Sequence, residues 1–179
     1  MAYTIRPATT ADFPALFAYM DDHLSDNGRG ETALFMPISR SESGFPRDKE
    51  SNMRKGIGVP VGQHGWRRPW IALTADGAIA GHVDLRARLE IACAHRALLG
   101  MGVHRDHRRQ GLGAQLVEVA AAWARQQSIA WIDLDVLSQN APAIALYLRC
   151  GFTLAGEIPD MFRIDGASLG HTFMTRKIG

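Results

Sequence analysis

The segment Arg108–Gly113 has the residue types of a phosphate-binding loop. It follows an apolar stretch that ends at Val103 and precedes a helix expected to begin near Gly111. A helix N-terminus presents backbone N–H groups without intrahelical partners, and the aligned peptide dipoles add partial positive charge there. Gly111 and Gly113 carry no side chain that would keep a phosphate from these donors, and the two arginines can add charge-assisted hydrogen bonds. The segment therefore predicts a site for a phosphate or pyrophosphate.

Two other glycine-rich phosphate loops do not fit. A dinucleotide-binding fingerprint needs G-x-G-x-x-G with an acid about 20 residues later, and a P-loop needs G-K-[ST] ahead of its helix. Here Gly111 and Gly113 are followed by Gln115 and Leu116, with no third glycine and no G-K-[ST] run. The basic cluster His104–Arg109 could also be a solvated face, which is the usual meaning of such a run. Because the cluster directly precedes a predicted helix, we favour its interpretation as part of an anion-binding site.

Apolar patterning places this loop inside a strand–helix–strand unit. Ala97–Val103 reads as a buried strand, and Ile129–Val136 reads as a second strand. Between them, apolar residues at helical spacing predict a helix, namely Leu116, Val117, Val119, Ala120 and Trp123. Two strands joined by one helix are expected to lie parallel in a sheet.

The remaining elements are predicted from alternation, helical spacing and turn residues. They are a strand over Tyr3–Arg6, a helix capped by Thr10 and running to Met20, strands over Trp70–Thr74 and Ile79–Leu85 around an Asp76-Gly77 turn, a helix over Ala141–Arg149 that stops at Gly151, and a hairpin of Phe152–Ile164 and Ser168–Arg176 around Asp165-Gly166.

The length of 179 residues suits one domain, residues 1–179, with a sizeable core. Residues 25–65 interrupt the regular pattern with many glycines and prolines among charges. Such an insertion is either a mobile loop or a lid over a substrate, and both interpretations stay open. A short helix over Arg47–Lys55 is compatible with it.

The composition is that of a soluble globular protein. Hydrophobic residues make up 46% and the net charge is +2, so no global field favours nucleic acid or a membrane. No uncharged apolar stretch reaches the roughly 18 residues that a membrane span requires. Cys93 and Cys150 form no CxxC pair and follow no secretory signal, so we expect free thiols and a cytoplasmic location. The histidines lack metal-ligand spacing, and we expect no metal.

The pattern Val103, Arg108, Gly111 and Gly113 resembles the acetyl-CoA-binding motif Val-x-x-x-x-Arg-x-x-Gly-x-Gly of the GNAT superfamily of N-acetyltransferases. The later run Asn140–Phe152 is similar to that family's Asn-x-x-Ala-x-x-Leu-Tyr-x-x-x-Gly-Phe segment. The two motifs stand in the family's order, separated by one helix and one strand. The family often has a proline where this chain has Arg105, a change that bears on loop stiffness more than on binding.

The resemblance implies an α/β fold with a mixed, mostly antiparallel central sheet, a splayed parallel strand pair and flanking helices. It implies that the strand ending at Val103 splays from its parallel neighbour and pairs with the pantetheine arm of acetyl-CoA, as an added strand would. A normal closed pair is the alternative. The residues expected to bind acetyl-CoA are Met101, Gly102, Val103, Arg108, Arg109, Gln110, Gly111, Leu112, Gly113, Ala114, Asn140 and Tyr147.

Tyr147 occupies the position of the family's general acid, which protonates the leaving thiolate of CoA. Alternatively its ring only packs in the core. Asn140 either binds pantetheine or caps the following helix.

A general base must take a proton from the substrate ammonium, and the sequence does not single one out. Asp135 and Glu90 are the catalytic candidates put forward with Tyr147, and Asp84, His95 and Asp133 lie equally close to central strands. A structural ion pair is the commoner role for such acids.

Three other residues are expected to have structural roles. His82 and His104 are interpreted as surface or structural residues. Cys150, at a helix end, is interpreted as a buried small residue, so acetyl transfer is expected to be direct.

The expected activity is acetyl transfer from acetyl-CoA to a primary amine of a small molecule, as in single-domain bacterial members that the run Gly156–Gly166 resembles. A protein N-terminus or lysine is the second acceptor considered, and a catalytically silent acyl-CoA sensor is a further alternative. The expected partners are a small-molecule amine and a second copy of the chain as a homodimer, with no nucleic acid and no membrane.

Overall fold

The computed structural model describes residues 2–30, 32–42 and 44–178. In chain order the elements are β1 (Thr4–Pro7), η1 (Thr10–Asp12), α1 (Phe13–Ser25), α2 (Arg47–Gly56), β2 (Arg67–Leu73), β3 (Ile79–Ala87), η2 (Ile91–Cys93), β4 (Arg96–Val103), η3 (Arg105–His107), α3 (Leu112–Gln126), β5 (Trp131–Leu137), α4 (Ala141–Arg149), β6 (Thr153–Ile164) and β7 (Ala167–Lys177).

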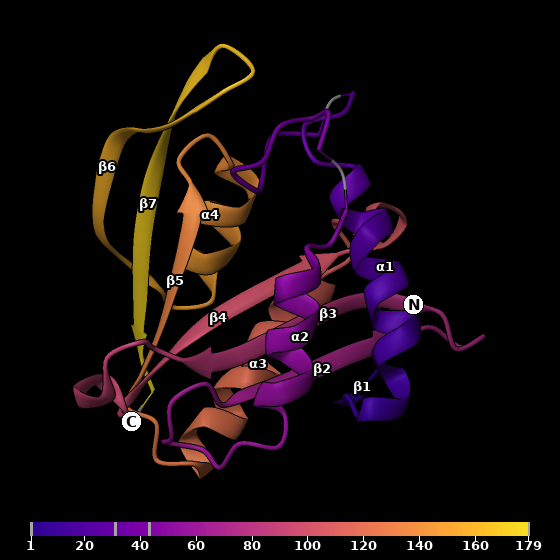
Figure 1. Ribbon diagram of the computed structural model, residues 1–179, viewed down its shortest axis with the longest axis vertical. Helices are drawn as coiled ribbons and strands as arrows, with labels where there is room; N and C mark the ends of the chain where they lie inside the picture. The colour runs from indigo at the N-terminus through magenta and orange to yellow at the C-terminus, as the bar shows by residue number, and fades with distance from the viewer. Residues whose placement is uncertain (1, 31, 43, 179) are drawn as a thin grey trace.

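The strands form one seven-stranded sheet in the order β1-β2-β3-β4-β5-β7-β6. Every neighbouring pair is antiparallel except β4 and β5, which are parallel. The predicted mixed, mostly antiparallel sheet with helices on its faces is therefore confirmed (Figure 1).

The parallel pair is short, and its two strands separate along their length. Only Arg96↔Trp131, Ala97↔Ile132 and Leu98↔Asp133 are partners, although β4 goes on to Val103 and β5 to Leu137. On its other side, β4 stays paired to β3 along its whole length past the splay. Figure 1 shows β4 and β5 starting side by side near the C-terminus and then diverging. The predicted splay is confirmed, and it leaves one edge of β4 without a strand partner after Leu98.

A buried ion cluster lies where the two strands separate. Asp133 accepts hydrogen bonds from Arg96 at 2.8 and 2.5 Å, from Arg88 at 3.0 Å and from the Thr175 hydroxyl at 2.7 Å. These bonds tie β4, β5, β7 and the end of β3 together at the last paired position. Charge-assisted bonds of this kind are about twice as strong as neutral ones, so the cluster fixes the point from which the strands diverge.

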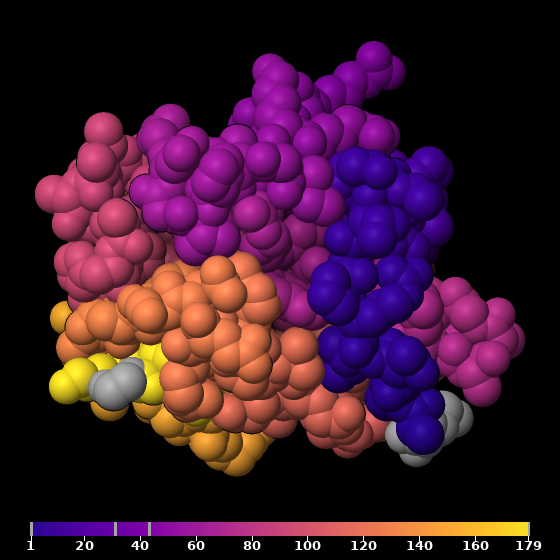
Figure 2. Space-filling view, turned by 90° about the horizontal axis from the view of Figure 1, so that it is seen from below, coloured from indigo at the N-terminus to yellow at the C-terminus, as the bar shows by residue number. Residues whose placement is uncertain are grey.

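Helices cover the two faces of the sheet. α3 buries its apolar side against β2, β3 and β4, through Leu112, Leu116 and Val117. On the opposite face, α1 and α2 form a second core with Ile71 of β2, to which Phe13 and Met53 contribute. In the space-filling view the α2 segment (purple) lies above α3 (orange), and the N-terminal segment (indigo) runs down the right of the view beside both (Figure 2).

α3 and α4 approach closely at Gly113. A Cβ at this position would lie 2.8 Å from Leu146 Cδ2, closer than carbon atoms tolerate. The sequence argument gave Gly113 the task of admitting a phosphate. In the structure the lack of a side chain also leaves room for the Leu146 side chain of α4, which would otherwise have to shift.

The segment between α1 and β2 is more regular than its composition predicts. It contains the ten-residue helix α2, close to the short helix considered from the sequence. Before α2, the buried Asn27 side chain accepts hydrogen bonds from the backbone N–H groups of Phe35 and Met36, at 2.8 and 3.0 Å. It also donates to the carbonyls of Met36 and Ile38. The Asn27 side chain therefore provides hydrogen-bond partners for backbone groups of this loop that belong to no helix or strand.

Two details of the sequence prediction were wrong. The helix near the N-terminus begins as the 3-10 turn η1 capped at Thr9 rather than at Thr10, because Asp12 binds back to the Thr9 backbone at 2.8 Å. β2 and β3 also extend further than their apolar runs, since Arg67 and Arg86 pair within the sheet.

Candidate active site

A cleft of about 1830 Å³ opens where β4 and β5 separate. Its walls come from β2, β3, β4, β5, the N-terminal turn of α3, α4, α1, α2 and the segment that precedes α2. Pockets for one small molecule usually measure about 300–1,000 Å³. The cleft is therefore large enough to take two substrates side by side.

One end of the cleft is formed by the predicted phosphate loop. Gly111 has φ 80°, a left-handed conformation that favours glycine, and its Cβ direction is open, with no atom within 4 Å. The first backbone bond of α3 runs from Gln115 N to Gly111 O, so the N–H groups of Leu112, Gly113 and Ala114 precede it without intrahelical acceptors. The loop fits a pyrophosphate, because it combines these donors with empty space at Gly111.

The long side chains of the loop make other contacts. The Arg108 guanidinium forms an ion pair with Asp26 at 2.5 Å and donates to the Val103 carbonyl at 3.1 Å, which braces the loop against the end of α1. Gln110 accepts from the Tyr3 hydroxyl at 2.9 Å. Arg109 stands at φ 60° on the cleft wall and is exposed. Of the two arginines expected to meet a phosphate, only Arg109 has a side chain without such an ion pair in the described structure.

The free edge of β4 forms the middle of the cleft. Met101, Gly102 and Val103 line it beyond the last residue paired with β5. Met101 turns toward α3, where its Cε lies 3.4 Å from the Cβ position of Gly113. Gly102 faces the opposite side of the sheet, where His23 Nε2 lies 2.5 Å from its Cβ position. The sheet thus separates a loop-side half of the cleft from a second half that faces α1 and α2.

Tyr147 lines the cleft from α4. Its ring packs edge-on against Phe152, with centroids 5.7 Å apart and an interplanar angle of 61°. Burial raises the pKa of its phenol, with a smaller contribution from Cys150. No protein partner hydrogen-bonds its hydroxyl in the described residues. The ring therefore packs in the core, as one interpretation expected, and the residue also lines the cleft, while its role as a general acid stays a prediction.

Asn140 caps α4, and its binding of pantetheine stays a prediction. Its side chain accepts a bond from Ala143 N at 3.4 Å as a helix cap, and it lines the cleft.

The structure separates the candidate bases into three groups. Asp135, on β5 beyond the splay, is exposed and lines the cleft, on the same face of the strand as Asp133. Glu90 and His95 lie at the closed end of the splay, outside the cleft lining, because the chain enters β4 there. The Glu90 carboxylate is 3.9 Å from Arg88.

The last two candidates, Asp84 and Asp133, are held by arginines. Burial alone would raise the pKa of each carboxyl, but Arg67 and Arg86 at Asp84, and Arg96 with Thr175 and Arg88 at Asp133, lower it overall. A carboxylate so occupied is a poor proton acceptor. Among these five candidates, Asp135 is therefore the acid that lines the cleft without an arginine partner.

A buried histidine pair that the sequence argument missed lies over Gly102. His23 of α1 and His82 of β3 have ring centroids 6.3 Å apart, and Tyr19 hydroxyl lies 3.4 Å from His82 Nδ1. Of the two interpretations of His82, surface or structural, burial excludes the surface one. His82 lies 59 positions after His23 and 63 positions after Tyr19 in the sequence. The one local sign of this cluster in the sequence is that Tyr19 and His23, four residues apart, share a helix face.

Both histidines are uncharged at neutral pH. Burial lowers the pKa of His23 to about 3, helped by the nearby cationic groups, and lowers that of His82 to about 4. His23 Nδ1 is buried and has no hydrogen-bond partner within the described part of the chain. Within residues 2–30, 32–42 and 44–178, no three His, Cys, Asp or Glu side chains gather as a metal site would require.

The chain is similar to known acetyltransferases. The sequence model described as Acetyltransferase (GNAT) family matches residues 37–152. An L-methionine sulfoximine/L-methionine sulfone acetyltransferase of Pseudomonas aeruginosa is 36% identical over 183 residues, which cover 97% of this chain and 94% of that protein. A streptothricin acetyltransferase of Escherichia coli is 41% identical over 54 residues, and the match spans only 31% of its length.

The fold is also similar to solved structures. A GNAT superfamily phosphinothricin acetyltransferase from Sinorhizobium meliloti, in complex with acetyl-CoA, superimposes with a TM-score of 0.79 at 20% identity. The match covers 100% of this chain and 90% of that one. No helix in the described part of the chain combines the length and apolar character that crossing a bilayer requires.

The buried histidines predict a stability that depends on pH. Because their folded pKa values lie below the usual 6.5, the unfolded chain binds more protons between pH 6.5 and about 4, and the free energy of unfolding falls as the pH falls through this window. From pH 7 to pH 5 each histidine should remove up to about 2 kcal/mol. Urea unfolding at both pH values measures this.

The double variant His23→Gln/His82→Gln should lose most of that pH dependence, whereas His64→Gln, at an exposed histidine, should keep it. An unchanged slope between pH 7 and pH 5 in the double variant would show that other groups govern the acid instability.

Proposed function

Because the chain belongs to the acetyltransferase (GNAT) family, an N-acetyltransferase family, we propose that it acetylates a primary amine of a small molecule in the β4–β5 cleft. One observation carries this proposal. The splay opens the sheet between a phosphate-binding helix end on one side and a covered, half-enclosed space on the other.

Acetyl-CoA supplies the activated acetyl thioester. Its pyrophosphate fits the N–H groups of Leu112–Ala114 and the open space at Gly111. The free edge of β4 offers backbone groups of Met101–Val103 to the pantetheine arm, as to an added strand. α4 brings Tyr147 to the same cleft.

Tyr147 and Asp135 are proposed to handle protons on opposite sides of the splay. The Asp135 carboxylate, on the side that faces α1 and α2, takes the proton of the acceptor ammonium, directly or through water. The Tyr147 hydroxyl, on the α4 side, donates to the sulfur as negative charge develops there. Because burial raises the pKa of this phenol, it stays protonated and stabilises the thiolate mainly as a hydrogen-bond donor.

Transfer is proposed to be direct. Cys150 is buried at the end of α4, and burial raises the pKa of its thiol, with Glu118 adding to the effect. A thiol that keeps its proton is a poor nucleophile. Cys150 is therefore not an intermediate acetyl carrier in this scheme.

A small acceptor is favoured by the cover over the α1 side of the cleft. Ser39 and the Arg40 backbone bind the Asp165 carboxylate at 2.6 and 3.0 Å, which joins the segment before α2 to the β6–β7 hairpin. Leu34 packs with Leu137 and Leu169 beneath this bridge. Figure 1 shows the hairpin tip and this segment at the same end of the molecule. A folded protein would have to displace the bridge, whereas a small amine fits beneath it.

Three further expectations stay proposals. A single domain is supported by one sheet that both helical layers share. A cytoplasmic location is supported by two free thiols, Cys93 and Cys150. A homodimer is supported by the long edge strand β6, which exposes Leu154, Ile158 and Met161.

Gly111→Trp tests the donor site. An indole here would fill the space assigned to the pyrophosphate and remove several charge-assisted hydrogen bonds to it. The affinity for acetyl-CoA should therefore fall at least about 100-fold. The matched control is Gly77→Trp, which has the same strained backbone (φ 85° against 80°) and open surroundings but does not line the cleft. Calorimetric titration with acetyl-CoA measures both, and normal binding by Gly111→Trp would refute the site.

Tyr147→Phe and Asp135→Asn should affect different parts of the reaction. Tyr147→Phe keeps the packed ring, so acetyl-CoA affinity should hold while kcat falls about 100-fold. Asp135→Asn should lose activity at neutral pH and recover as rising pH deprotonates the amine without help. Thiol release from acetyl-CoA with a panel of amines, followed from pH 6.5 to 9.5, measures both. A kcat for Tyr147→Phe equal to wild type, or no recovery for Asp135→Asn, would contradict the respective role.

A further inference from the structure

A cationic cluster on the α1 side of the cleft surrounds one carboxylate. Asp84 of β3 is buried, and Arg67 of β2 holds it through two bonds of 2.8 Å, Nε to Oδ1 and Nη2 to Oδ2. Arg86 shares the same carboxylate through a longer contact of 3.3 Å from Nη1 to Oδ1. Arg67 therefore satisfies Asp84 by itself, and Arg86 retains donors that face the cleft.

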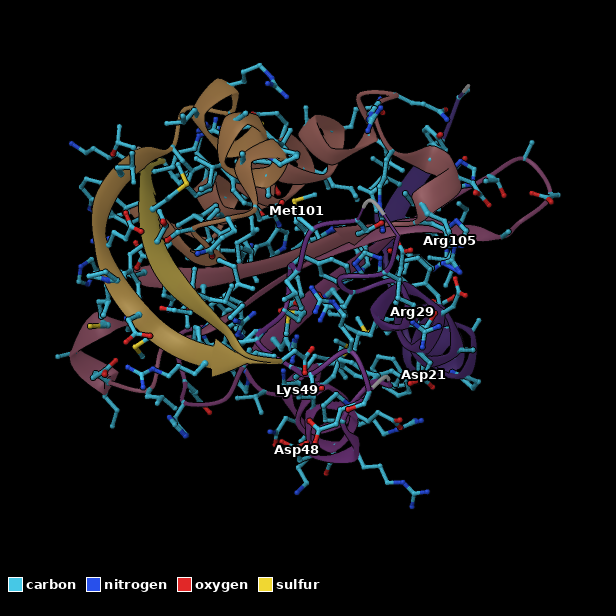
Figure 3. All side chains as sticks on the ribbon, turned by 90° about the horizontal axis from the view of Figure 1, so that it is seen from above. Asp21, Arg29, Asp48, Lys49, Met101 and Arg105 are labelled. Carbon is cyan, nitrogen blue, oxygen red and sulfur yellow. The ribbon has the colours of Figure 1, made fainter. Side chains whose placement is uncertain are left out.

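Lys49 adds a third cation to this cluster. It lies on α2, is half-buried, and lines the cleft together with Arg67 and Arg86 (Figure 3 labels Lys49). Burial lowers the pKa of its ammonium, and Arg86 and Arg67 lower it further, while Asp48 opposes the effect. No ion pair or hydrogen bond of the Lys49 ammonium is found among residues 2–30, 32–42 and 44–178. The cluster thus carries an excess of positive charge in a partly desolvated place.

A second arginine pair, at the closed end of the splay, serves as an internal comparison. Arg88 and Arg96 share Asp133, but Glu90 lies 3.9 Å from Arg88, so two acids face two bases there. That cluster is balanced and lies at the closed end of the splay. The Lys49, Arg67 and Arg86 cluster is unbalanced and lies where the splay is open.

The unbalanced cluster lies directly over the free part of β4. The Cβ position of Gly100 is 2.9 Å from Arg86 Nη1 and 3.0 Å from Asp84 Oδ2. Gly100 is two residues past Leu98, the last residue of β4 that pairs with β5. An anion bound by Arg86 would therefore lie against the strand segment along which acetyl-CoA is proposed to bind.

We infer that Lys49 and Arg86 form a subsite for the carboxylate of the acceptor, and that the acceptor is an α-amino acid. Arg67 and Asp84 act as a positioning pair that holds Arg86 in place. This inference rests on the acetyl transfer proposed above and names its substrate class. In an α-amino acid one carbon separates amine and carboxylate, so a carboxylate on Arg86 places the amine beside the free edge of β4.

The same charges discriminate between acceptors. A polyamine or a lysine-rich peptide would bring further positive charge to the cluster, which repels it. The cations also favour the neutral form of a nearby amine, because a like charge lowers the pKa of an ammonium. One cluster would therefore select for the carboxylate and help prepare the amine for attack.

The test compares amino acids with their decarboxylated amines. Wild type, Arg86→Gln, Lys49→Met and the control Arg163→Gln, at an exposed arginine of β6, are assayed with a panel of L-amino acids that includes L-methionine sulfone. Each is paired with the amine that lacks its carboxylate, such as 3-(methylsulfonyl)propylamine. Thiol release gives kcat/KM, and calorimetry in the presence of CoA gives the affinity of the amino acid without turnover.

Wild type and Arg163→Gln should prefer at least one amino acid over its amine, and Arg86→Gln and Lys49→Met should each reduce that preference about 10- to 100-fold without weakening acetyl-CoA binding. The subsite is overturned if wild type binds no amino acid more tightly than its amine, or if Arg86→Gln keeps the preference. Amino acid binding without turnover on any amine would instead refute the proposed acetyl transfer and leave the subsite standing.

Discussion

The cleft exists because the parallel strands β4 and β5 pair over only a short part of their length. β4 and β5 are parallel partners at three positions only, and the buried Asp133 cluster with Arg88, Arg96 and Thr175 holds them together at the last of these. Beyond it, β4 keeps β3 as a partner and β5 keeps β7, so neither strand is lost from the sheet. The sheet therefore opens in its middle without unfolding at its edges, and a cleft forms between strands instead of on a surface.

The two sides of this opening have different electrostatics. On the α3 side, backbone N–H groups and the left-handed Gly111 provide a place for phosphate. On the α1 side, the fold buries His23 and His82 in their neutral forms, sets Arg67 and Arg86 on the Asp84 carboxylate, and lines the cleft with Lys49. The strand β4 separates them and borders both. A donor with a pyrophosphate and an acceptor with a carboxylate can thus meet at one strand from opposite faces.

The features that the sequence predicted well depend on residues close together in the chain. The strand and helix around Arg108–Gly113 follow from apolar spacing, and the splay followed from the resemblance carried by Val103–Gly113 and Asn140–Phe152. It predicted poorly what depends on partners distant in sequence. Asp133 looked like a candidate base until the arginines at positions 88 and 96 were found to hold it. The choice between a surface and a structural role for His82 stayed open because its neighbours Tyr19 and His23 lie on a helix about 60 positions earlier.

The central claim is that acetyl-CoA binds along the free edge of β4 and at the N-terminal turn of α3. Residue-resolved amide hydrogen exchange, with and without saturating acetyl-CoA, tests it most directly, because exposed backbone N–H groups that gain a ligand acceptor exchange more slowly. The account predicts slower exchange within Leu99–Val103 and Leu112–Ala114, with little change in the paired residues Arg96–Leu98. Slower exchange confined to other strands, or none at all under saturation, would contradict it.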